Sequence, residues 1–323
     1  MLIPCYNAER WLVNTLRSSL DQSWGNVEII LVDDGSKDNS LRIAKSFESE
    51  RVKVISQENR GASVARNVAY AHAQGDYIQH LDADDFLSCD KIEAQVKFLE
   101  TAPSNYLALS ATMHFFDGSD PDQGLLHDDW PLVDSDNPRE WLIDLYGPEQ
   151  GGMVQPGSWL VPRTITDKVG KWNETIDPSP DNDGEYFARV VLASSGIRKC
   201  PEGINYYRKF RNGVSMSGQR SAAYQAGAIR SLDLIQIALL AEAQEERALK
   251  ALARRYKEVA FTAYPYAPEV SELALARARK LGFGDFKPCF PTAKGRLLSE
   301  TVGWRLARRL NVYWHQLRHA LKG

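Results

Sequence analysis

The stretch "VEIILVDDGS", residues 27–36, is a run of β-branched and aliphatic residues that ends in two carboxylates. A strand that is apolar on both sides is typical of a parallel sheet whose two faces are covered by helices. In such sheets, ligands bind beyond the carboxyl ends of the strands, where Asp33 and Asp34 would lie. The stretch therefore predicts a fold class and the edge of the sheet that holds the site.

The segments around this stretch alternate in type. Strands are expected at "LIPCYN" (2–7), "RVKVISQ" (51–57) and "DYIQHLDADD" (76–85). Helical spacing of apolar residues marks "ERWLVNTLRSSLDQ" (9–22), "DNSLRIAKSFES" (38–49), "ASVARNVAYAHAQG" (62–75) and "DKIEAQVKFLETA" (90–102). Four strand–helix pairs in succession predict an α/β domain with a mainly parallel sheet and helices on both faces.

The remaining chain is less regular. We expect strands at "YLALSATMHFF" (106–116) and "GINYYRKF" (203–210), and an amphipathic helix at "DNDGEYFARVVLASS" (181–195). Residues 117–138 are acidic and rich in Pro and Gly, which predicts a long functional loop. From about residue 218 the pattern is helical almost to the end. Two regions are therefore predicted, an α/β domain over 1–217 and a helical region over 218–323.

The composition excludes several classes of protein. The 323 residues are 43% hydrophobic and 25% charged, as in ordinary globular proteins. The net charge of −3 provides no basic field for nucleic acid. The four cysteines form no CxxC pair, which argues against a zinc site and fits a reducing compartment. With no signal peptide and no apolar run of ~18 residues, we expect a cytoplasmic protein.

Three carboxylates crowd the end of the strand predicted at 76–85. Asp82 and Asp84 would point to one side of an extended segment and Asp85 to the other. At ~4 Å and an effective dielectric of ~20, each like-charged pair costs on the order of 4 kcal/mol. A hard divalent cation, Mg²⁺ or Mn²⁺, would remove that repulsion and keep positions open for phosphate oxygens. The alternative is a solvated acidic turn at the start of the next helix.

Four blocks together carry a resemblance to a known family. They are "IPCYNAERWL" (3–12), "ILVDDGSKDNS" (30–40), "NRGASVARNVAYAHAQGDYIQHLDADD" (59–85) and "DGEYFARV" (183–190). In this order they resemble the signature blocks of family 2 glycosyltransferases, over roughly residues 2–215. The resemblance implies a GT-A fold, a Rossmann-like nucleotide-diphospho-sugar transferase fold with a mixed sheet. It also implies inverting transfer of a sugar from an NDP-sugar, with a UDP-sugar favoured for this chain, to an acceptor hydroxyl.

The resemblance implies a donor site along the strand ends. Asp84 would reach the metal, and Asp82 the ribose or the metal through water. Asp33 or Asp34 would accept a hydrogen bond from an N–H of the base, with Asp34 favoured. Arg66 would lie near the base and phosphate, where its planar guanidinium makes forked contacts. Each alternative is structural, namely a capping Asp-Gly turn or a plain amphipathic helix.

Two further segments would complete the donor site in this family. Pro4 and Tyr6 would start a loop over the base, on which Tyr6 could stack. Arg208, Lys209 and Arg211 would lie in a loop that closes over the diphosphate and stabilises the leaving group. The alternatives are packing of Tyr6 on the sheet edge and a solvated basic loop.

The base that deprotonates the acceptor is expected at the start of the helix at 181–195. The family places an acidic pair there, usually Glu-Asp, and the aligned residues are Asn182 and Asp183. We assign Asp183 as the general base, and Asn182 in place of Glu leaves Asp181 and Glu185 as rivals. The alternative is acidic N-capping of the helix. Tryptophans at 130, 159 and 172 could stack on sugar faces or fill the core.

The last thirty residues form a basic amphipathic segment. Its basic residues are Lys294, Arg296, Arg305, Arg308, Arg309, Arg318 and Lys322, against the single acid Glu300. Interleaved aromatic and leucine residues make it typical of a helix on the inner face of the plasma membrane. A lipid-linked acceptor, as in polysaccharide or lipopolysaccharide synthesis, would suit that location. The alternative is a helix packed on the catalytic domain.

Two other functions remain as alternatives. A nucleotidyltransferase on a similar fold should carry a Gly-rich basic loop after its first strand, where this chain has "CYNAERW" (5–11). A non-catalytic nucleotide-sugar-binding module would keep the donor site and transfer nothing.

Overall fold

The computed structural model describes residues 1–128, 131–147, 152, 154–210, 221–285, 288, 290 and 292–320, with side chains up to residue 314. Three parallel strands form its first sheet, in the order β1–β2–β3. They are β1 (Leu2–Cys5), β2 (Ile29–Asp33) and β3 (Val52–Ser56). Every residue of β2 is buried, as the apolar run predicts.

Helices connect these strands, as the alternation predicts. They are α1 (Leu12–Leu20), α2 (Ser40–Ser46), α3 (Ala62–His72) and, after the next short strands, α4 (Lys91–Thr101). Gly61 precedes α3 with a φ of 94°, a left-handed conformation that favours glycine. Its Cβ position would lie 3.3 Å from a carboxylate oxygen of Asp177, so the chain also approaches closely there.

A second, mixed sheet continues from the first and has the order β4–β8–β6–β9–β5. Its strands are β4 (Tyr77–Ile78), β5 (Phe86–Leu87), β6 (Tyr106–Phe116), β8 (Trp159–Pro162) and β9 (Gly196–Lys209), with β7 (Leu125–His127) beside β6. A parallel bridge between Leu2 and His80 joins the two sheets. The β6–β9 pair is parallel, whereas β8 lies antiparallel to both β4 and β6.

Two sequence predictions need correction in this region. The strand expected at 76–85 is limited to Tyr77–Ile78, because the backbone N–H of Asp85 donates to the carbonyl of Asp82 and closes a turn. The segment 117–138 is not one long loop. It contains a 3₁₀ turn (Pro121–Gln123) and β7, and at its end α5 (Pro138–Tyr146) begins. The side chain of Asn137 caps α5 by accepting from the N–H of Glu140.

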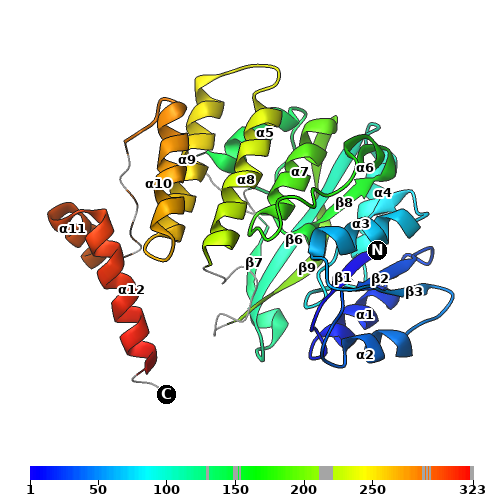
Figure 1. Cartoon of the computed structure of the whole chain (residues 1–323). Helices are drawn as coiled ribbons and strands as arrows, with labels where there is room; N and C mark the ends of the chain where they lie inside the picture. Colours follow the sequence, from blue (N-terminus) through cyan, green and yellow to red (C-terminus); the bar gives the residue numbers. More distant parts are fainter. Residues whose placement is uncertain are drawn as a thin grey trace.

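Helices extend the molecule beyond the sheet. They are α6 (Arg163–Val169), α7 (Asn182–Ala193), α8 (Ala222–Leu239), α9 (Glu246–Ala263), α10 (Pro268–Lys280), α11 (Ala293–Val302) and α12 (Trp304–Ala320). Figure 1 shows α7 to α10 side by side, with α11 and α12 at the far end. One apolar core runs from Trp159 in the sheet through α7 to Tyr256 in α9. The predicted domain boundary at 217/218 lies outside the described residues.

Candidate active site

The carboxyl ends of β1 and β2 lie side by side, because Cys5 pairs with Asp33 in the parallel register. The predicted polar edge therefore forms, with Asp33 and Asp34 at its centre. Tyr6 follows β1 and is 49% exposed, so its ring is available to a ligand. Pro4, which we expected in the loop, lies within β1 and pairs with Val32.

Asp34 holds the loop between β3 and α3. Its carboxylate accepts hydrogen bonds from Gln57 Nε2 (2.7 Å), Arg60 N (2.9 Å) and Gly61 N (2.8 Å). These bonds occupy three of about four lone-pair positions of a carboxylate. The side chain is buried, and one acceptor position is left for a ligand. The main role of Asp34 in the described structure is therefore to hold the segment 57–61 in place.

Asp33 carries an unused acceptor. Its Oδ2 accepts a long hydrogen bond from Ser36 N (3.3 Å), while its Oδ1 is buried without a partner among the described residues. Leaving a buried polar atom unsatisfied costs about 1–3 kcal/mol. A ligand N–H at this oxygen would offset that cost, so Asp33 is at least as well placed as Asp34 to bind a base.

Arg66 reaches across the strand ends from α3. Its Nη2 donates to Asp82 Oδ1 at 2.8 Å, and its guanidinium lies 4.4 Å from the centre of the Trp172 ring. The side chain is only 7% exposed. Its Nε and Nη1 have no partner among the described residues, so two buried donors remain for a ligand anion.

In the acidic turn, Asp85 is buried, Asp82 and Asp84 are partly exposed, and the three carboxylates repel one another. Burial, reinforced by Asp82, raises the pKa of Asp84 to about 7. Burial and the neighbouring Asp84 likewise raise the pKa of Asp85 well above its usual range. The turn therefore holds more carboxylate than its surroundings neutralise.

Arg208 stabilises this turn from a strand, which corrects the prediction that it lies in a loop. Arg208 and Lys209 end β9. The Arg208 backbone N–H donates to Asp85 Oδ1 (2.8 Å), its Nε to the carbonyl of Asp84 (2.8 Å) and its Nη1 to Asp117 Oδ1 (3.0 Å). Arg211, the third basic residue of the predicted loop, lies outside the described residues.

Asp117 is a member of this network that the sequence did not indicate. Besides Arg208, it accepts hydrogen bonds from Trp11 Nε1 (3.0 Å) and Arg10 Nη2 (3.3 Å). It therefore links the segment after β1 to the end of β9. No local signal distinguishes Asp117 from the other acids of its segment, because its partners are distant in sequence.

Asp82 and Asp84 suit a cation that takes few protein ligands. Within the part of the chain that the structure describes, no three His, Cys, Asp or Glu side chains are grouped to bind a metal. Mg²⁺ sites on phosphate substrates commonly use only one or two carboxylates, with phosphate and water completing the shell. Burial first, and the charge of Asp82 second, raise the pKa of Asp84, and a bound cation would stabilise its ionised form. The two carboxylates therefore fit a cation that arrives with a diphosphate.

The acids at the start of α7 differ in their partners. Asp181 forms an ion pair with Arg255 (3.2 Å), and Glu185 forms one with Arg189 (2.7 Å). Asp183 has no ion pair among the described residues, and its Oδ1 accepts only from the adjacent Gly184 N–H. Burial, followed by the charge of Asp181, raises the pKa of Asp183 to about 6. The charges of Arg66 and Asp82 also act on its pKa, in opposite directions.

Asn182 connects α7 to α3. Its Nδ2 donates to Asp177 Oδ1 (3.1 Å) and contacts Ser63 Oγ at 3.4 Å. The other oxygen of Asp177 accepts from the backbone N–H of Ser63 at 3.3 Å. One carboxylate therefore binds the first turns of both helices.

The tryptophans proposed for sugar stacking lie in the core. The Trp172 ring stacks on Tyr186 at 4.2 Å, and Trp159 stacks on Phe187 at 5.3 Å. Both tryptophans are buried. Trp130 lies outside the described residues.

Sequence comparison identifies the family to which this α/β chain belongs. The family model "Glycosyl transferase family 2" matches residues 1–169, and the chain belongs to that family.

Curated relatives match about a third of the chain. An uncharacterised glycosyltransferase of Haemophilus influenzae is 44% identical over 102 residues, which cover 31% of this chain and 41% of the relative. Glycosyltransferase GlyG of Streptococcus pneumoniae is 43% identical over 96 residues (29% and 32%). Chondroitin synthase of Escherichia coli is 41% identical over 93 residues (28% and 14%). The matched stretch spans less than half the length of each of these relatives.

Solved structures share the GT-A fold over most of the chain. S. aureus TarS in complex with UDP superposes with a TM-score of 0.58 at 16% identity, covering 87% of each chain. The mannosyltransferase PcManGT from Pyrobaculum calidifontis, in complex with GDP-Man and Mn²⁺, has a TM-score of 0.52 at 16% identity, covering 97% of this chain and 86% of that one. The predicted GT-A fold with a mixed sheet and a helical C-terminal region is confirmed.

Proposed function

We propose that the chain transfers a sugar, with inversion, from an NDP-sugar, most simply a UDP-sugar, to an acceptor hydroxyl. The observation that carries this proposal is the carboxylate of Asp183, which has no ion pair among the described residues and is within electrostatic range of the Arg66–Asp82 pair. A carboxylate with a pKa near 6 is mostly deprotonated at neutral pH and still basic enough to accept a proton.

The nucleoside would bind at the ends of β1 and β2. Asp33 Oδ1 or the fourth acceptor position of Asp34 receives an N–H of the base, and Tyr6 covers its face. Asp33 and Asp34 are acceptors only, which favours a base that presents an N–H, as uracil does. The complex of TarS with UDP supports this choice of nucleotide.

The diphosphate would bind between Arg66 and the acidic turn. Arg66 Nε and Nη1 are donors without partners among the described residues, and Asp84 with Asp82 would hold Mn²⁺ or Mg²⁺. The cation would neutralise charge that develops on the leaving diphosphate. Arg208 holds the turn in place through the carbonyl of Asp84, and adds positive charge nearby.

Asp183 would act on the acceptor. It accepts the proton of the acceptor hydroxyl while the oxygen attacks the anomeric carbon, and the diphosphate leaves with the bonding electrons. Inversion follows from attack on the face opposite the leaving group. Asp181 and Glu185 are less suitable bases because their carboxylates are already engaged in ion pairs with Arg255 and Arg189.

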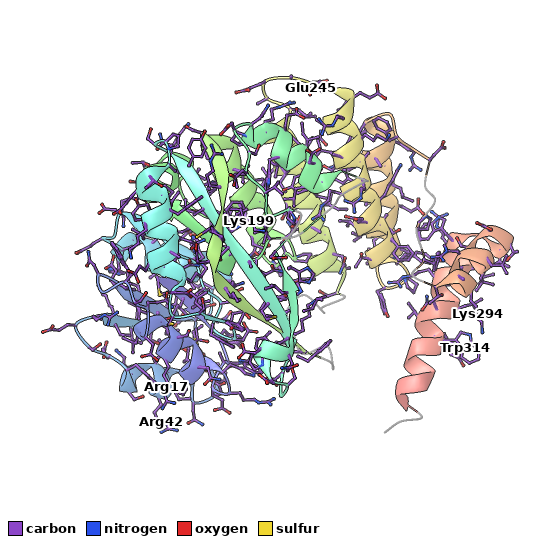
Figure 2. The ribbon with its side chains drawn as sticks, turned by 180° about the vertical axis from the view of Figure 1, so that it is seen from behind. Arg17, Arg42, Lys199, Glu245, Lys294 and Trp314 are labelled. Carbon is purple, nitrogen blue, oxygen red and sulfur yellow. The ribbon has the colours of Figure 1, made fainter. Side chains whose placement is uncertain are left out.

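The acceptor would be reached at the inner face of the plasma membrane. No described helix is long and apolar enough to cross a membrane. Beyond its contacts with α9 and α10, however, α12 exposes Leu306, Tyr313 and Trp314, with Arg305 and Arg309 nearby. Figure 2 shows Lys294 and Trp314 on α11 and α12, away from the sheet. Polysaccharide synthesis, the activity that the name chondroitin synthase implies for that relative, suits a lipid-linked acceptor.

A thermal-shift screen with nucleoside diphosphates and NDP-sugars, with and without Mn²⁺, tests the donor assignment. A ligand at 100 times its Kd stabilises by about 2.7 kcal/mol, so the true donor should raise the Tm only when Mn²⁺ is present. Absence of any metal-dependent shift across uridine, guanosine, adenosine, cytidine and thymidine nucleotides would contradict the proposal. Zero donor turnover by both wild type and Asp183→Asn, measured with the donor that gives the largest shift, would favour a binding module instead.

A further inference from the structure

A cavity adjoins Asp183, the proposed base. It has a volume of about 1240 Å³ and lies between α5, α7, α8 and α9. Ligand pockets usually measure about 300–1,000 Å³, so this one can hold more than a monosaccharide. Asp183 lines the cavity, and the charges of Arg66 and Asp82 also influence its pKa. Asp183 therefore connects this space with the donor site.

One wall of the cavity is apolar. It is built by Trp141 and Leu145 of α5, Trp159 of β8, and Phe187 and Val191 of α7. All five side chains are buried in the described structure, so they are held firmly by the core behind them. An apolar wall of this kind favours a ligand group that leaves water on binding.

The opposite wall comes from α9, in the region beyond the family match. Val259, Phe261 and Thr262 line it, together with Arg254 and Arg255. The charges of these two arginines are already compensated. Arg255 pairs with Asp181 and Glu258, and Arg254 pairs with Glu258 at 2.7 Å. Lys250 and Lys257 of the same helix also line the cavity, so this wall is charged where the opposite wall is apolar.

We propose that this cavity receives the apolar part of an amphipathic acceptor, an alkyl or aryl group joined to the sugar or polyol whose hydroxyl reacts at Asp183. The inference rests on the proposed function and adds the acceptor class to it. In the transfer, the bond from the anomeric carbon to the diphosphate oxygen breaks, a bond to the acceptor oxygen forms, and Asp183 takes the hydroxyl proton. The helix α9 thereby completes the acceptor site.

The test uses the full chain with methyl and octyl β-D-glucoside, titrated below micelle formation in the presence of UDP and Mn²⁺. Trp141 and Trp159 in the wall provide intrinsic fluorescence as the readout. We expect the octyl glucoside to bind at least tenfold more tightly than the methyl glucoside. Equal affinities would overturn the inference.

A variant that fills the cavity tests whether the octyl group binds there. Thr262 is exposed on α9 and lines the cavity, so Thr262→Trp should fill it without disturbing the core. It should reduce the octyl preference to below twofold. Ile237→Trp, at a position of α8 that is 68% exposed and does not line the cavity, is the matched control and should keep the preference. If Thr262→Trp melts without cooperativity, Val259→Trp replaces it.

Two further measurements separate the possible failures. If Trp314→Ala loses the octyl preference and Thr262→Trp keeps it, the octyl group binds at α12, and the inference is overturned. The Tm shift with UDP and Mn²⁺ is recorded for every variant. A shift without chain-length preference contradicts only the acceptor class. Chain-length preference without any nucleotide shift contradicts the proposed function, and with it the acceptor role of the cavity.

Discussion

Arg66 and Asp82 form a salt bridge of 2.8 Å at the end of the sheet, with the guanidinium almost completely buried. Removing one member of a buried pair typically costs 3–5 kcal/mol, because the other charge is left uncompensated. The neighbouring face of Trp172 adds a cation–π contact at 4.4 Å. Arg66 is thus fixed on two sides, and its remaining donors are held in place before a ligand arrives.

Arg66→Lys should weaken UDP binding by at least tenfold, because an ammonium cannot bind Asp82 and a phosphate with a planar fork. Isothermal titration with UDP and Mn²⁺ measures the Kd. Arg60→Lys is the matched control, since only the backbone N–H of Arg60 contacts Asp34. Unchanged UDP affinity in Arg66→Lys would exclude Arg66 from the donor site.

Asp183→Asn should lower kcat by about 10²–10⁴-fold and leave the Kd for UDP unchanged, because it removes only the base. Burial, then Asp181, sets the pKa of Asp183 at about 6. The wild-type rate should therefore rise with pH through about 6, as the carboxylate loses its proton, and level off above it. A pH–rate profile that keeps this limb in Asp183→Asn would show that another group is the base.

Asp84→Asn should abolish the metal-dependent Tm shift with UDP. It should also change the stability of the metal-free protein. The pKa of Asp84 is raised to about 7, so the folded state binds its proton more tightly than the unfolded state between about pH 4 and 7. The free energy of unfolding therefore falls as pH rises through this window. The variant should lack this loss and melt higher than wild type at pH 8 in EDTA.

Asp33→Ala and Asp34→Ala should differ in their effects on the free energy of unfolding. Asp34→Ala removes the acceptor of three hydrogen bonds and should lower the free energy of unfolding by about 1–3 kcal/mol for each donor left unsatisfied. Asp33→Ala removes an oxygen that is already unpaired, so the loss of stability should be smaller. Urea unfolding measures stability, and the ratio of UDP to CDP affinity measures base recognition. Equal stability losses would contradict this division.

The exposed side of α12 should bind anionic membranes. Vesicles with 30% phosphatidylserine should carry the full chain in flotation, and neutral vesicles should not, since each basic residue adds about 1 kcal/mol near an anionic surface. Tyr313→Ser combined with Trp314→Ser should reduce flotation at least fivefold. Equal flotation by the double variant would place the contact elsewhere.

Local pattern was sufficient for the first half of the fold. The apolar run before Asp33 predicts a buried strand and the position of its acids, because both depend on neighbours in sequence. The pattern predicts an extended segment at the acidic turn, and it fails there because the geometry depends on Arg208, which is 123 residues from Asp85. The strand β7 lacks a local signal for the same reason, since it is defined by pairing of His127 with Thr112. The helix α5 does have a local signal, the cap Asn137 followed by Pro138.

The site shows the same division. The sequence indicated which residue types gather at the sheet edge, but not how their hydrogen bonds are shared. The oxygens of Asp34 accept hydrogen bonds from the 57–61 loop, and Asp181 forms an ion pair with Arg255 of α9. Neither partner can be inferred from spacing, because each belongs to an element packed from elsewhere in the chain.

The carboxylate of Asp177 has a mechanical consequence. It accepts a hydrogen bond from the first turn of α3, the helix that carries Arg66. It accepts another from Asn182 in the first turn of α7, the helix that carries Asp183. Under the proposed function, a shift of α3 on diphosphate binding would be passed through Asp177 and Asn182 to α7, so that Arg66 and Asp183 would move together.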